Sequence, residues 1–393
     1  MFLLIENAEV YAPRPLGRQD ILIAGEKIAW MGRDFPARAT LPDLEIVDGR
    51  GHLILPGFVD NHVHIIGGGG EGSFRTRTPE IVLTDLTLAG VTSVIGVLGT
   101  DCVTRHTASL IAKARALEEE GLSAWALLGS YQLPLRPFTG HVQDDIVLID
   151  KLIGVGEVAL SDHRSSQPQK EELLRIAAAS RVAAMLSGKG GIVNVHLGDG
   201  PGKLDMLFDI ADTSEIALPQ FLPTHLNRNP DLFEASIGYA LAGGHVDMTT
   251  STTPLFLAEG EVKCSVALRR LLDAGVPSER ISFSSDGQGS LPDFDERGRF
   301  KGLSIGRSNS IWPEVRDAVV DEKIPLETAL AVITSSPADQ HKLPGRKGHV
   351  ETGADADLVL VDDSSLSIRT VVARGRLMVR DGEPLLFGTF EKA

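Results

Sequence analysis

Apolar positions with helical spacing alternate with short β-rich runs through the middle of the chain. Residues 171–188 carry apolar side chains at helical spacing and end in a glycine, and the β-rich run 191–198 follows directly. The same order of helix and strand recurs in three other segments, residues 108–131, 229–251 and 266–287. This repetition predicts helices and strands that alternate along one domain.

A further segment carries an explicit helix-start signal. Thr78 and Pro79 suit the N-cap and the first position of a helix, and Gly90 suits its end before the β-rich run 91–99. Strands that alternate with helices over 53–347 predict an α/β fold, a parallel (β/α)8 TIM-like barrel, whose active site lies at the carboxyl ends of the strands. A doubly wound open sheet is the alternative.

Both ends of the chain have a different pattern. Residues 1–52 and 348–393 consist of short β-rich runs broken by Gly, Pro and Asp, with Asp-Gly turns in the second segment. Such runs are typical of hairpin strands. We expect the two segments to combine in one small β-sandwich domain beside the barrel.

Composition narrows the class of protein. The 393 residues are 42% hydrophobic, enough for a large core, and the net charge of −15 without a basic cluster argues against nucleic-acid and anionic membrane partners. Cys102 and Cys264 are far apart, so no disulfide framework or cysteine metal site is indicated. No apolar run has the length of a membrane span, and the start, MFLLIENAEVYAPRP, lacks the basic region of a signal peptide. We therefore expect a soluble cytoplasmic protein.

The segment 59–72, VDNHVHIIGGGGEG, contains the first candidate site. His62 and His64 point to the same face of a strand, so they can hold one metal ion. The glycines that follow allow a sharp turn or a close approach of the backbone to a ligand, and Glu71 comes next. Surface histidines followed by a plain turn are the alternative. Alone, the segment gives a hypothesis of a metal site beside a pocket.

Other imidazoles and carboxylates also stand where β-rich runs end. These residues are Glu157, His196, His225 and Asp286. In a barrel, all of them would meet at one rim, and nitrogen and carboxylate ligands without thiolates suit zinc or a similar divalent ion. We expect two ions, with the ligands divided as His62, His64 and Asp286 for one, His196 and His225 for the other, and Glu157 as the bridge.

This arrangement predicts hydrolytic chemistry. Between two such ions a water can be held as hydroxide at neutral pH and can attack an amide carbonyl. Asp286 would touch a metal and face this water, which makes it the candidate proton shuttle. A single tightly bound ion, with Glu157 as a carboxylate of the barrel core, is the alternative.

These residues carry a resemblance to a known family. A pair of histidines on the first strand, a carboxylate on the fourth, histidines on the fifth and sixth and an aspartate on the eighth resemble the amidohydrolase superfamily. Nearly the whole chain is similar to the β-aspartyl (isoaspartyl) dipeptidases of that superfamily, in the segments DNHVHIIGGGGEG, GVTSVIGVLGTD, SDHRSS, LPTHLNRN and SSDGQGS. The resemblance implies a metal-dependent dipeptidase that cleaves the peptide bond formed by an aspartate side-chain carboxyl.

Such a substrate presents a free α-carboxylate and a free α-ammonium near the scissile amide, so its site requires guanidinium groups and an acid together. By the resemblance, Arg164 and Arg228 would hold the α-carboxylate. Glu71 would pair with the α-ammonium with help from Ser290, and Thr100 is assigned to the same pocket. The structural alternatives are a loop salt bridge for Arg164, a turn cap for Ser290 and plain solvation for Glu71.

Two further assignments concern the catalytic pocket. Tyr131 would, by the resemblance, donate to the oxyanion of the tetrahedral intermediate, with a core tyrosine as the alternative. Asp162 and His163 are interpreted as supporting or structural groups beside Arg164.

The chain departs from many relatives at one position. Where these have a carboxylated lysine, counted back from Arg164, this chain has Glu157, which is anionic at neutral pH by its ordinary pKa. Its side chain is shorter, and we expect Gly154 and Gly156 to let the backbone come nearer the metals.

The preferred interpretation is therefore a β-aspartyl dipeptidase with two divalent metal ions, Zn2+ being the expected ion, a small dipeptide substrate and a homo-oligomeric state. One alternative keeps the metals and changes the substrate to a cyclic amide or an N-acyl amino acid. Another is a non-catalytic scaffold, which should have lost metal ligands that this chain keeps.

Overall fold

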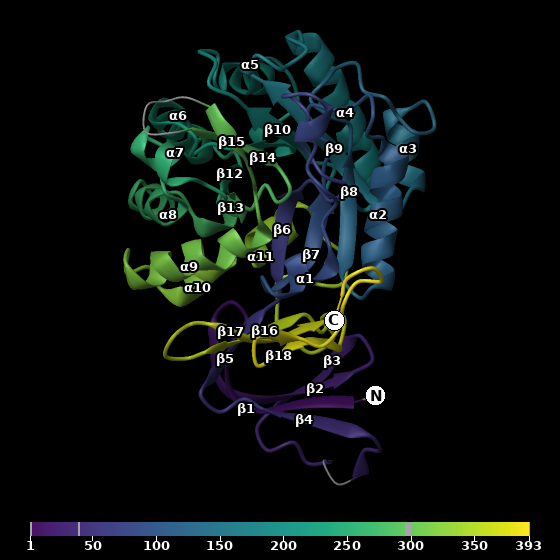
Figure 1. Cartoon of the computed structure of the whole chain (residues 1–393), viewed down its shortest axis with the longest axis vertical. Coiled ribbons are helices and arrows are strands. Elements are labelled where there is room, and N and C mark those ends of the chain that lie inside the picture. The colour runs from purple at the N-terminus through teal and green to yellow at the C-terminus, as the bar shows by residue number, and fades with distance from the viewer. Residues whose placement is uncertain (1, 38–39, 295–299, 393) are drawn as a thin grey trace.

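Eight parallel strands form the centre of the larger part of the molecule (Figure 1). The computed structural model describes residues 2–37, 40–294 and 300–392. The eight strands are β6 (Phe58–Val63), β7 (Val91–Gly96), β8 (Ser123–Leu128), β9 (Leu152–Leu160), β10 (Val193–Leu197), β11 (Phe221–Thr224), β12 (Val246–Thr249) and β13 (Ile281–Ser284). Strands β6 to β11 pair in sequence order, and β12 pairs with β13.

The sheet closes on itself at two places. Between β11 and β12, the Leu226 amide donates to the Asp247 carbonyl at 3.3 Å. Between β13 and β6, Val63 forms a parallel bridge with Gly287, and the His64 amide donates to the Gly287 carbonyl at 2.9 Å. The barrel prediction is confirmed, and the open doubly wound sheet is excluded.

Helices surround the barrel and cover its outer face (Figure 1). They are α1 (Leu83–Thr87), α2 (Thr107–Glu119), α3 (Val142–Leu148), α4 (Lys170–Ser187), α5 (Asp205–Thr213), α6 (Pro230–Leu241), α7 (Pro254–Ala258), α8 (Cys264–Asp273), α9 (Ile311–Val320), α10 (Leu326–Ala331) and α11 (Ser335–Gln340). The predicted helices at 108–121, 171–188, 229–244 and 266–275 correspond to α2, α4, α6 and α8. Among the helices of the described ranges, none combines the length and hydropathy that a membrane-spanning segment needs.

The sequence also predicts a helix that starts at Thr78, and this predicted start is wrong. Thr78 is no N-cap, because α1 begins only at Leu83. The Thr78 hydroxyl instead donates to the carbonyl of Gln288 at 2.6 Å and accepts from the Gly68 amide at 2.7 Å. A contact with the far end of the barrel sequence therefore overrides the local helix signal.

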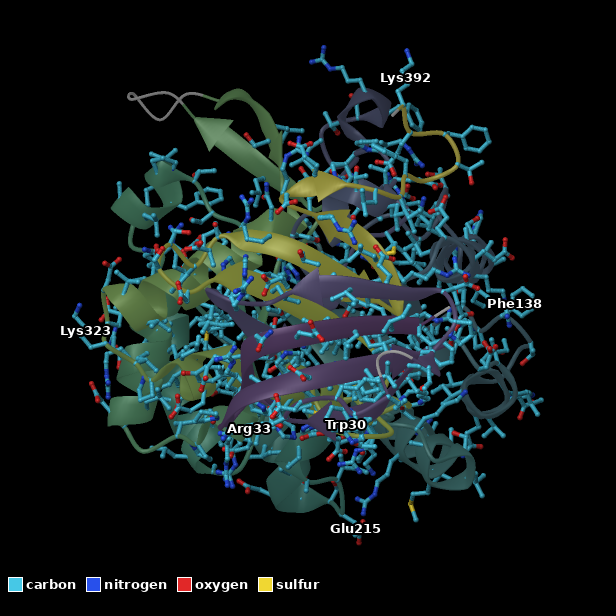
Figure 2. The ribbon with its side chains drawn as sticks, turned by 90° about the horizontal axis from the view of Figure 1, so that it is seen from below. Trp30, Arg33, Phe138, Glu215, Lys323 and Lys392 are labelled. Carbon is cyan, nitrogen blue, oxygen red and sulfur yellow. The ribbon has the colours of Figure 1, made fainter. Side chains whose placement is uncertain are left out.

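The two ends of the chain form a second part, which lies below the barrel in Figure 1. Its nine strands are β1 (Phe2–Tyr11), β2 (Pro15–Ala24), β3 (Lys27–Gly32), β4 (Leu44–Asp48), β5 (His52–Pro56), β16 (Leu358–Asp362), β17 (Ile368–Ala373), β18 (Arg376–Arg380) and β19 (Glu383–Pro384). They pair in the order β19-β18-β17-β16-β5-β1-β2-β3, and β4 also pairs with β1. Seen from below, these strands lie across the barrel end (Figure 2).

One apolar core holds this terminal sheet together. Ile5 and Ile23 from the N-terminal segment pack with Leu358, Leu360 and Val372 from the C-terminal segment, all at most 1% exposed. Strands from both ends thus share one interior, as the sequence predicts, while the exact domain boundaries stay a prediction.

A hairpin, β14 (Ser290–Phe294) and β15 (Phe300–Ile305), follows the last barrel strand.

A buried ion cluster joins the terminal sheet to the barrel. Lys347 Nζ lies 2.7 Å from Asp355 Oδ2 and 2.5 Å from Asp357 Oδ2, and its side chain is 3% exposed. The carbonyl of Asp357 also accepts from the amide of Gly57, which directly precedes β6. The lysine therefore compensates two carboxylates at the point where the chain enters the barrel.

Replacing this lysine should destabilise the junction. Lys347→Ala leaves the buried carboxylate of Asp357 without a cation, while Asp355 keeps its ion pair with Lys27, so the free energy of unfolding should fall by about 3–5 kcal/mol. Urea denaturation followed by circular dichroism measures the change. Lys392→Ala is the control, because this lysine projects into solvent (Figure 2) and its loss should change stability by less than about 0.5 kcal/mol. Equal midpoints for the two variants would contradict a compensating role of Lys347.

Candidate metal centre and substrate pocket

The six proposed metal ligands meet at the carboxyl ends of the barrel strands. His62 lies in β6 and His64 directly after it, Glu157 lies in β9 and His196 in β10, while His225 and Asp286 follow β11 and β13. All six are at most 9% exposed. Parallel strands deliver their carboxyl ends to one rim, so residues far apart in sequence converge here.

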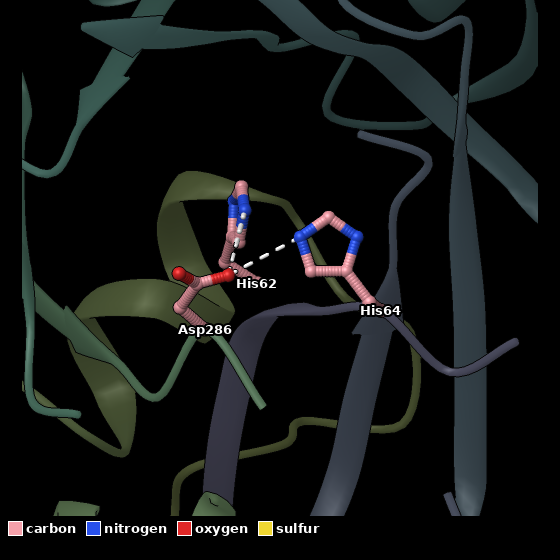
Figure 3. Close-up of side chains that lie close together, drawn as sticks. All are labelled: His62, His64 and Asp286. Carbon is pink, nitrogen blue, oxygen red and sulfur yellow. Dashed lines mark ion pairs between the residues drawn. The ribbon is translucent and has the colours of Figure 1, made fainter. Parts of the chain in front are cut away.

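Three of these residues form one compact group, shown in Figure 3. Asp286 Oδ1 lies 3.2 Å from His64 Nε2 and 4.0 Å from His62 Nε2. The ligand atoms of the three side chains lie within 4.8 Å of one another. This is the ligand set expected for the first ion.

Glu157 lies at the centre of the other ligands. Its Oε2 is 3.3 Å from His62 Nε2, 3.3 Å from His196 Nδ1 and 3.6 Å from His225 Nε2. Its Oε1 faces His64 Nε2 at 3.5 Å. Among the described residues, the second group with metal-site spacing is therefore His62, Glu157 and His225, whereas the sequence predicts His196 and His225 with Glu157 as the bridge.

The residues present fit a cationic group. Both oxygens of Glu157, both ring nitrogens of His62 and Nδ1 of His64 are buried and, within the part of the chain that the structure describes, accept or donate no hydrogen bond of good geometry. A buried carboxylate without donors is costly unless a cation compensates it. Nitrogen and oxygen ligands in this number suit one or two divalent ions.

The electrostatics of the cluster favour positive charge. Burial would lower the pKa of His62, but the carboxylates of Glu157 and Asp286 outweigh it and raise the pKa to about 9. Burial would raise the pKa of Glu157, but the surrounding imidazoles hold it well below its usual range. Burial and the neighbouring His196 lower the pKa of His225 to about 3. Glu157 is thus anionic and His225 neutral, the states in which both bind metals, whereas a metal would have to displace the proton that the raised pKa of His62 implies.

Two ligands are oriented by a second side chain. His225 Nδ1 lies 2.7 Å from Thr249 Oγ1, which leaves Nε2 toward Glu157. His196 Nε2 lies 3.0 Å from Asp162 Oδ2, which leaves Nδ1 toward Glu157. Such partners fix the ring orientation of a metal-binding histidine. Asp162 lies where a supporting residue was expected, while the side chain of His163 is 84% exposed.

Tyr131 also faces the cluster. Its hydroxyl lies 2.8 Å from His196 Nδ1, and the residue is 5% exposed. Burial raises the pKa of this phenol well above its usual range, so the hydroxyl keeps its proton and can donate a hydrogen bond.

Arg164 is held by an acid and keeps one nitrogen toward the pocket. Its Nε and Nη2 donate to the two oxygens of Asp162 at 2.9 and 2.7 Å. Its Nη1 makes a longer contact of 3.4 Å with Oε1 of Glu71. The guanidinium also stacks over Tyr131, with Cζ 5.2 Å from the ring centroid. The salt bridge considered as an alternative for Arg164 is therefore present, but it uses only one edge of the group.

Arg228 is also paired with an acid, but through one nitrogen. Its Nη1 donates to Oε2 of Glu261 at 2.9 Å and to the carbonyl of Ser251 at 3.1 Å. Its Nη2 lies 3.7 Å from Oδ2 of Asp286. Sequence reasoning missed Glu261, because nothing local in GEVKC marks this glutamate as the partner of a distant arginine.

The glycine run brings Glu71 to the same pocket. Its carboxylate accepts from the Thr100 hydroxyl at 2.8 Å and faces Arg164. Gly69 has a φ of 65°, and a Cβ there would lie 2.7 Å from the Thr76 carbonyl and 3.1 Å from Ser290 Cβ. The run is therefore a close approach of two segments, which only glycine permits, and it places Ser290 next to the segment that ends in Glu71.

A second buried aspartate supports the segment of Asp286. Asp60 Oδ1 accepts from the Ser285 amide at 3.0 Å, and its Oδ2 accepts from the Ser285 and Ser308 hydroxyls at 2.5 and 3.0 Å. Burial raises the pKa of Asp60 to about 6. Sequence reasoning missed this role, although Asp60 stands in the same motif as His62.

Comparisons with known proteins place the chain in a family. The model of the Amidohydrolase family matches residues 53–378. A crystal structure of a β-aspartyl dipeptidase from the thermophilic, keratin-degrading Fervidobacterium islandicum AW-1, in complex with a β-Asp-Leu dipeptide, has 43% sequence identity, 100% coverage of both chains and a TM-score of 0.90.

More distant relatives share less. The crystal structure of a dihydropyrimidinase from Brevibacillus agri NCHU1002 has 18% identity, covers 99% of this chain and 97% of its own, and has a TM-score of 0.68, a likeness of fold alone. A curated dihydroorotase from Lactobacillus johnsonii is 26% identical over 302 residues, which are 72% of this chain and 64% of that protein. The chain thus matches less than two thirds of this curated relative's length. The family match nevertheless extends over most of the chain, and two solved structures that match its whole length at 41–43% identity are of β-aspartyl dipeptidases, so the chain belongs to the amidohydrolase family.

Proposed function

We propose that this chain hydrolyses β-aspartyl dipeptides. One observation carries the proposal: a buried histidine–carboxylate cluster, two arginine edges and the Glu71 carboxylate converge in one pocket. The full-length likeness to a structure that holds a β-Asp-Leu dipeptide supports the same substrate class.

The pocket suits both charges of an isoaspartyl unit. Nη1 of Arg164 and Nη2 of Arg228 are the guanidinium nitrogens left toward the pocket, and together they would hold the substrate α-carboxylate. Glu71 would accept hydrogen bonds from the α-ammonium, with Thr100 and Ser290 beside it. In this complex the contact of Glu71 with Arg164 would be exchanged for contacts with the substrate.

His62, His64 and Asp286 would hold one ion and His196 and His225 the other, with Glu157 contributing to both. When bound, two divalent ions supply Lewis acidity to the scissile carbonyl and to the attacking water, and the imidazole and carboxylate donors favour Zn2+. Asp286 accepts the proton of the water through a carboxylate oxygen and passes it to the leaving amine. The Tyr131 hydroxyl donates to the developing oxyanion.

A cyclic-amide or N-acyl amino acid substrate remains the second candidate, since dihydropyrimidinase shares the fold. Cyclic amides and N-acyl amino acids lack a free α-ammonium, so neither substrate class would pair with the Glu71 carboxylate. A non-catalytic scaffold is disfavoured by the complete ligand set. A homo-oligomeric state and a cytoplasmic location stay predictions from the sequence.

Substrate choice and metal dependence test the proposal together. The purified protein should hydrolyse β-Asp-Leu and leave α-Asp-Leu intact, because only the first places the scissile amide beyond the side-chain methylene. Chelation should remove the metal and abolish hydrolysis, and plasma mass spectrometry measures the metal content. Added zinc should restore the bound metal and the activity. Full activity in protein with no bound metal would end the proposal.

Neutralising either arginine should weaken substrate binding more than turnover. Arg164→Met or Arg228→Met removes a charge-assisted hydrogen bond, so KM for β-Asp-Leu should rise about 10- to 100-fold. Arg181→Met is the control, since this arginine donates to the Glu215 carbonyl on the outer surface. An α-methyl ester of the substrate that wild-type protein cleaves normally would rule out the two arginines as the clamp.

We expect Glu157 to bridge two metal ions without the carbon dioxide that a carboxylated lysine requires. Protein stripped of metal should regain two ions per chain and its activity in bicarbonate-free buffer, because the glutamate is already anionic. Glu157→Gln should lose the second ion, counted by plasma mass spectrometry. Reconstitution that demands bicarbonate, or a Gln variant that keeps both ions and its rate, would refute the bridge.

A further inference from the structure

A buried arginine outside the proposed machinery connects two loops of the pocket rim. Arg105 lies in the loop between β7 and α2, and its side chain is 4% exposed. Its Nε donates to the Ile66 carbonyl at 3.2 Å and its Nη2 to the Thr78 carbonyl at 3.3 Å. Both acceptors belong to the loop between β6 and α1, on either side of Glu71. One guanidinium therefore holds both ends of the loop segment that carries this carboxylate.

An ion chain extends this contact to the next turn of the loop. Asp101 Oδ2 lies 3.3 Å from Arg105 Nη1 and 2.8 Å from Arg77 Nη1. Asp101 Oδ1 accepts from the amides of Val103 and Thr104 at 3.0 and 2.8 Å. Asp101 thus fixes the position of its own loop and of Arg105 at once.

The first glycine of the run, Gly67, packs against the Arg105 guanidinium. A Cβ at Gly67, whose φ is 77°, would lie 2.3 Å from the Thr78 carbonyl and 3.1 Å from Arg105 Nη2. From the same loop as Arg105, Thr100 donates to Glu71 at 2.8 Å. Residues 71–75 between these anchors are all exposed. Arg105, Arg77 and Thr100 therefore hold this tip together with Arg164, which contacts Glu71, and with Thr78, which bonds to Gln288.

We propose that Arg105, with Asp101, is a positioning unit that holds Glu71 where the substrate α-ammonium arrives, and so sets the preference for substrates with a free α-amino group. The inference rests on the proposed function. Arg105 touches neither the metal ligands nor the arginine clamp, so its effect should appear in recognition of the ammonium and leave the chemical step intact.

A pair of substrates separates this role from a general structural one. Succinyl-leucine has the same α-carboxylate and scissile amide as β-Asp-Leu but lacks the α-ammonium. In the holoenzyme, Arg105→Met should raise KM for β-Asp-Leu at least about 10-fold with kcat within about threefold, while the KM or inhibition constant of succinyl-leucine changes less than about twofold. In a Glu71→Gln background, the same substitution should cause no further loss for β-Asp-Leu, because both changes remove one interaction.

Matched variants keep the test decisive. Arg136→Met removes an exposed arginine that donates to the Cys102 carbonyl of the same loop, and it should leave both substrates unaffected. If Arg105→Met is insoluble, Asp101→Asn is measured in the same way. Equal losses for both substrates, or additive losses with Glu71→Gln, would overturn the inference. Wild-type protein that does not cleave β-Asp-Leu would instead overturn the proposed function.

Discussion

Closure of the parallel sheet between β6 and β13 is the constraint on which the site depends. The bridge from Val63 to Gly287 brings the first and last barrel strands side by side, and His64 and Asp286 flank that bridge. In an open sheet these two strands would lie at opposite edges, and the ligand group of Figure 3 could not form. Asp60 reinforces the same seam through Ser285, so the backbone before Asp286 is fixed from the first strand.

Charge compensation explains the groups that surround this seam. Arg164 and Arg228 are each paired with a buried acid, Asp162 and Glu261, whose side chains are 4% and 2% exposed. Each buried acid needs a cation, and the pairing keeps the arginine, whose side chain is 30% exposed in Arg164 and 20% in Arg228, in one orientation. Asp162 engages Nε and Nη2 of Arg164, and Glu261 engages Nη1 of Arg228, so each arginine keeps one terminal nitrogen for the proposed contact with a substrate carboxylate. Asp162 also contacts His196, so the proposed substrate clamp Arg164 and the proposed metal ligand His196 share one anchor.

The sequence predicts those features that follow from short-range pattern. Ligands such as His196 could be found because they end apolar runs, and parallel strands bring all such ends to one rim. The Arg228–Glu261 pair could not be found, since its members are 33 positions apart and each loop looks ordinary alone. The helix start at Thr78 was mispredicted for the same reason, because its hydroxyl bonds to Gln288, 210 positions away. Long-range hydrogen bonds leave no periodic trace in a sequence.

The glycine run illustrates how these two kinds of information combine. Its composition predicts a close backbone approach, and the structure identifies the neighbours as the Thr78 carbonyl, Arg105 and Ser290. Strand ends are held by the ladder of the barrel, whereas the rim loop is held by isolated backbone contacts, such as the bridge from Gly69 to Arg77, together with side chains. With three donors in one rigid plane, Arg105 bonds to two carbonyls of that loop and to Asp101 of its own loop. The metal ligands therefore depend on the barrel backbone, and the carboxylate that would read the substrate amine depends on a few loop contacts, which makes substrate preference easier to alter than metal binding.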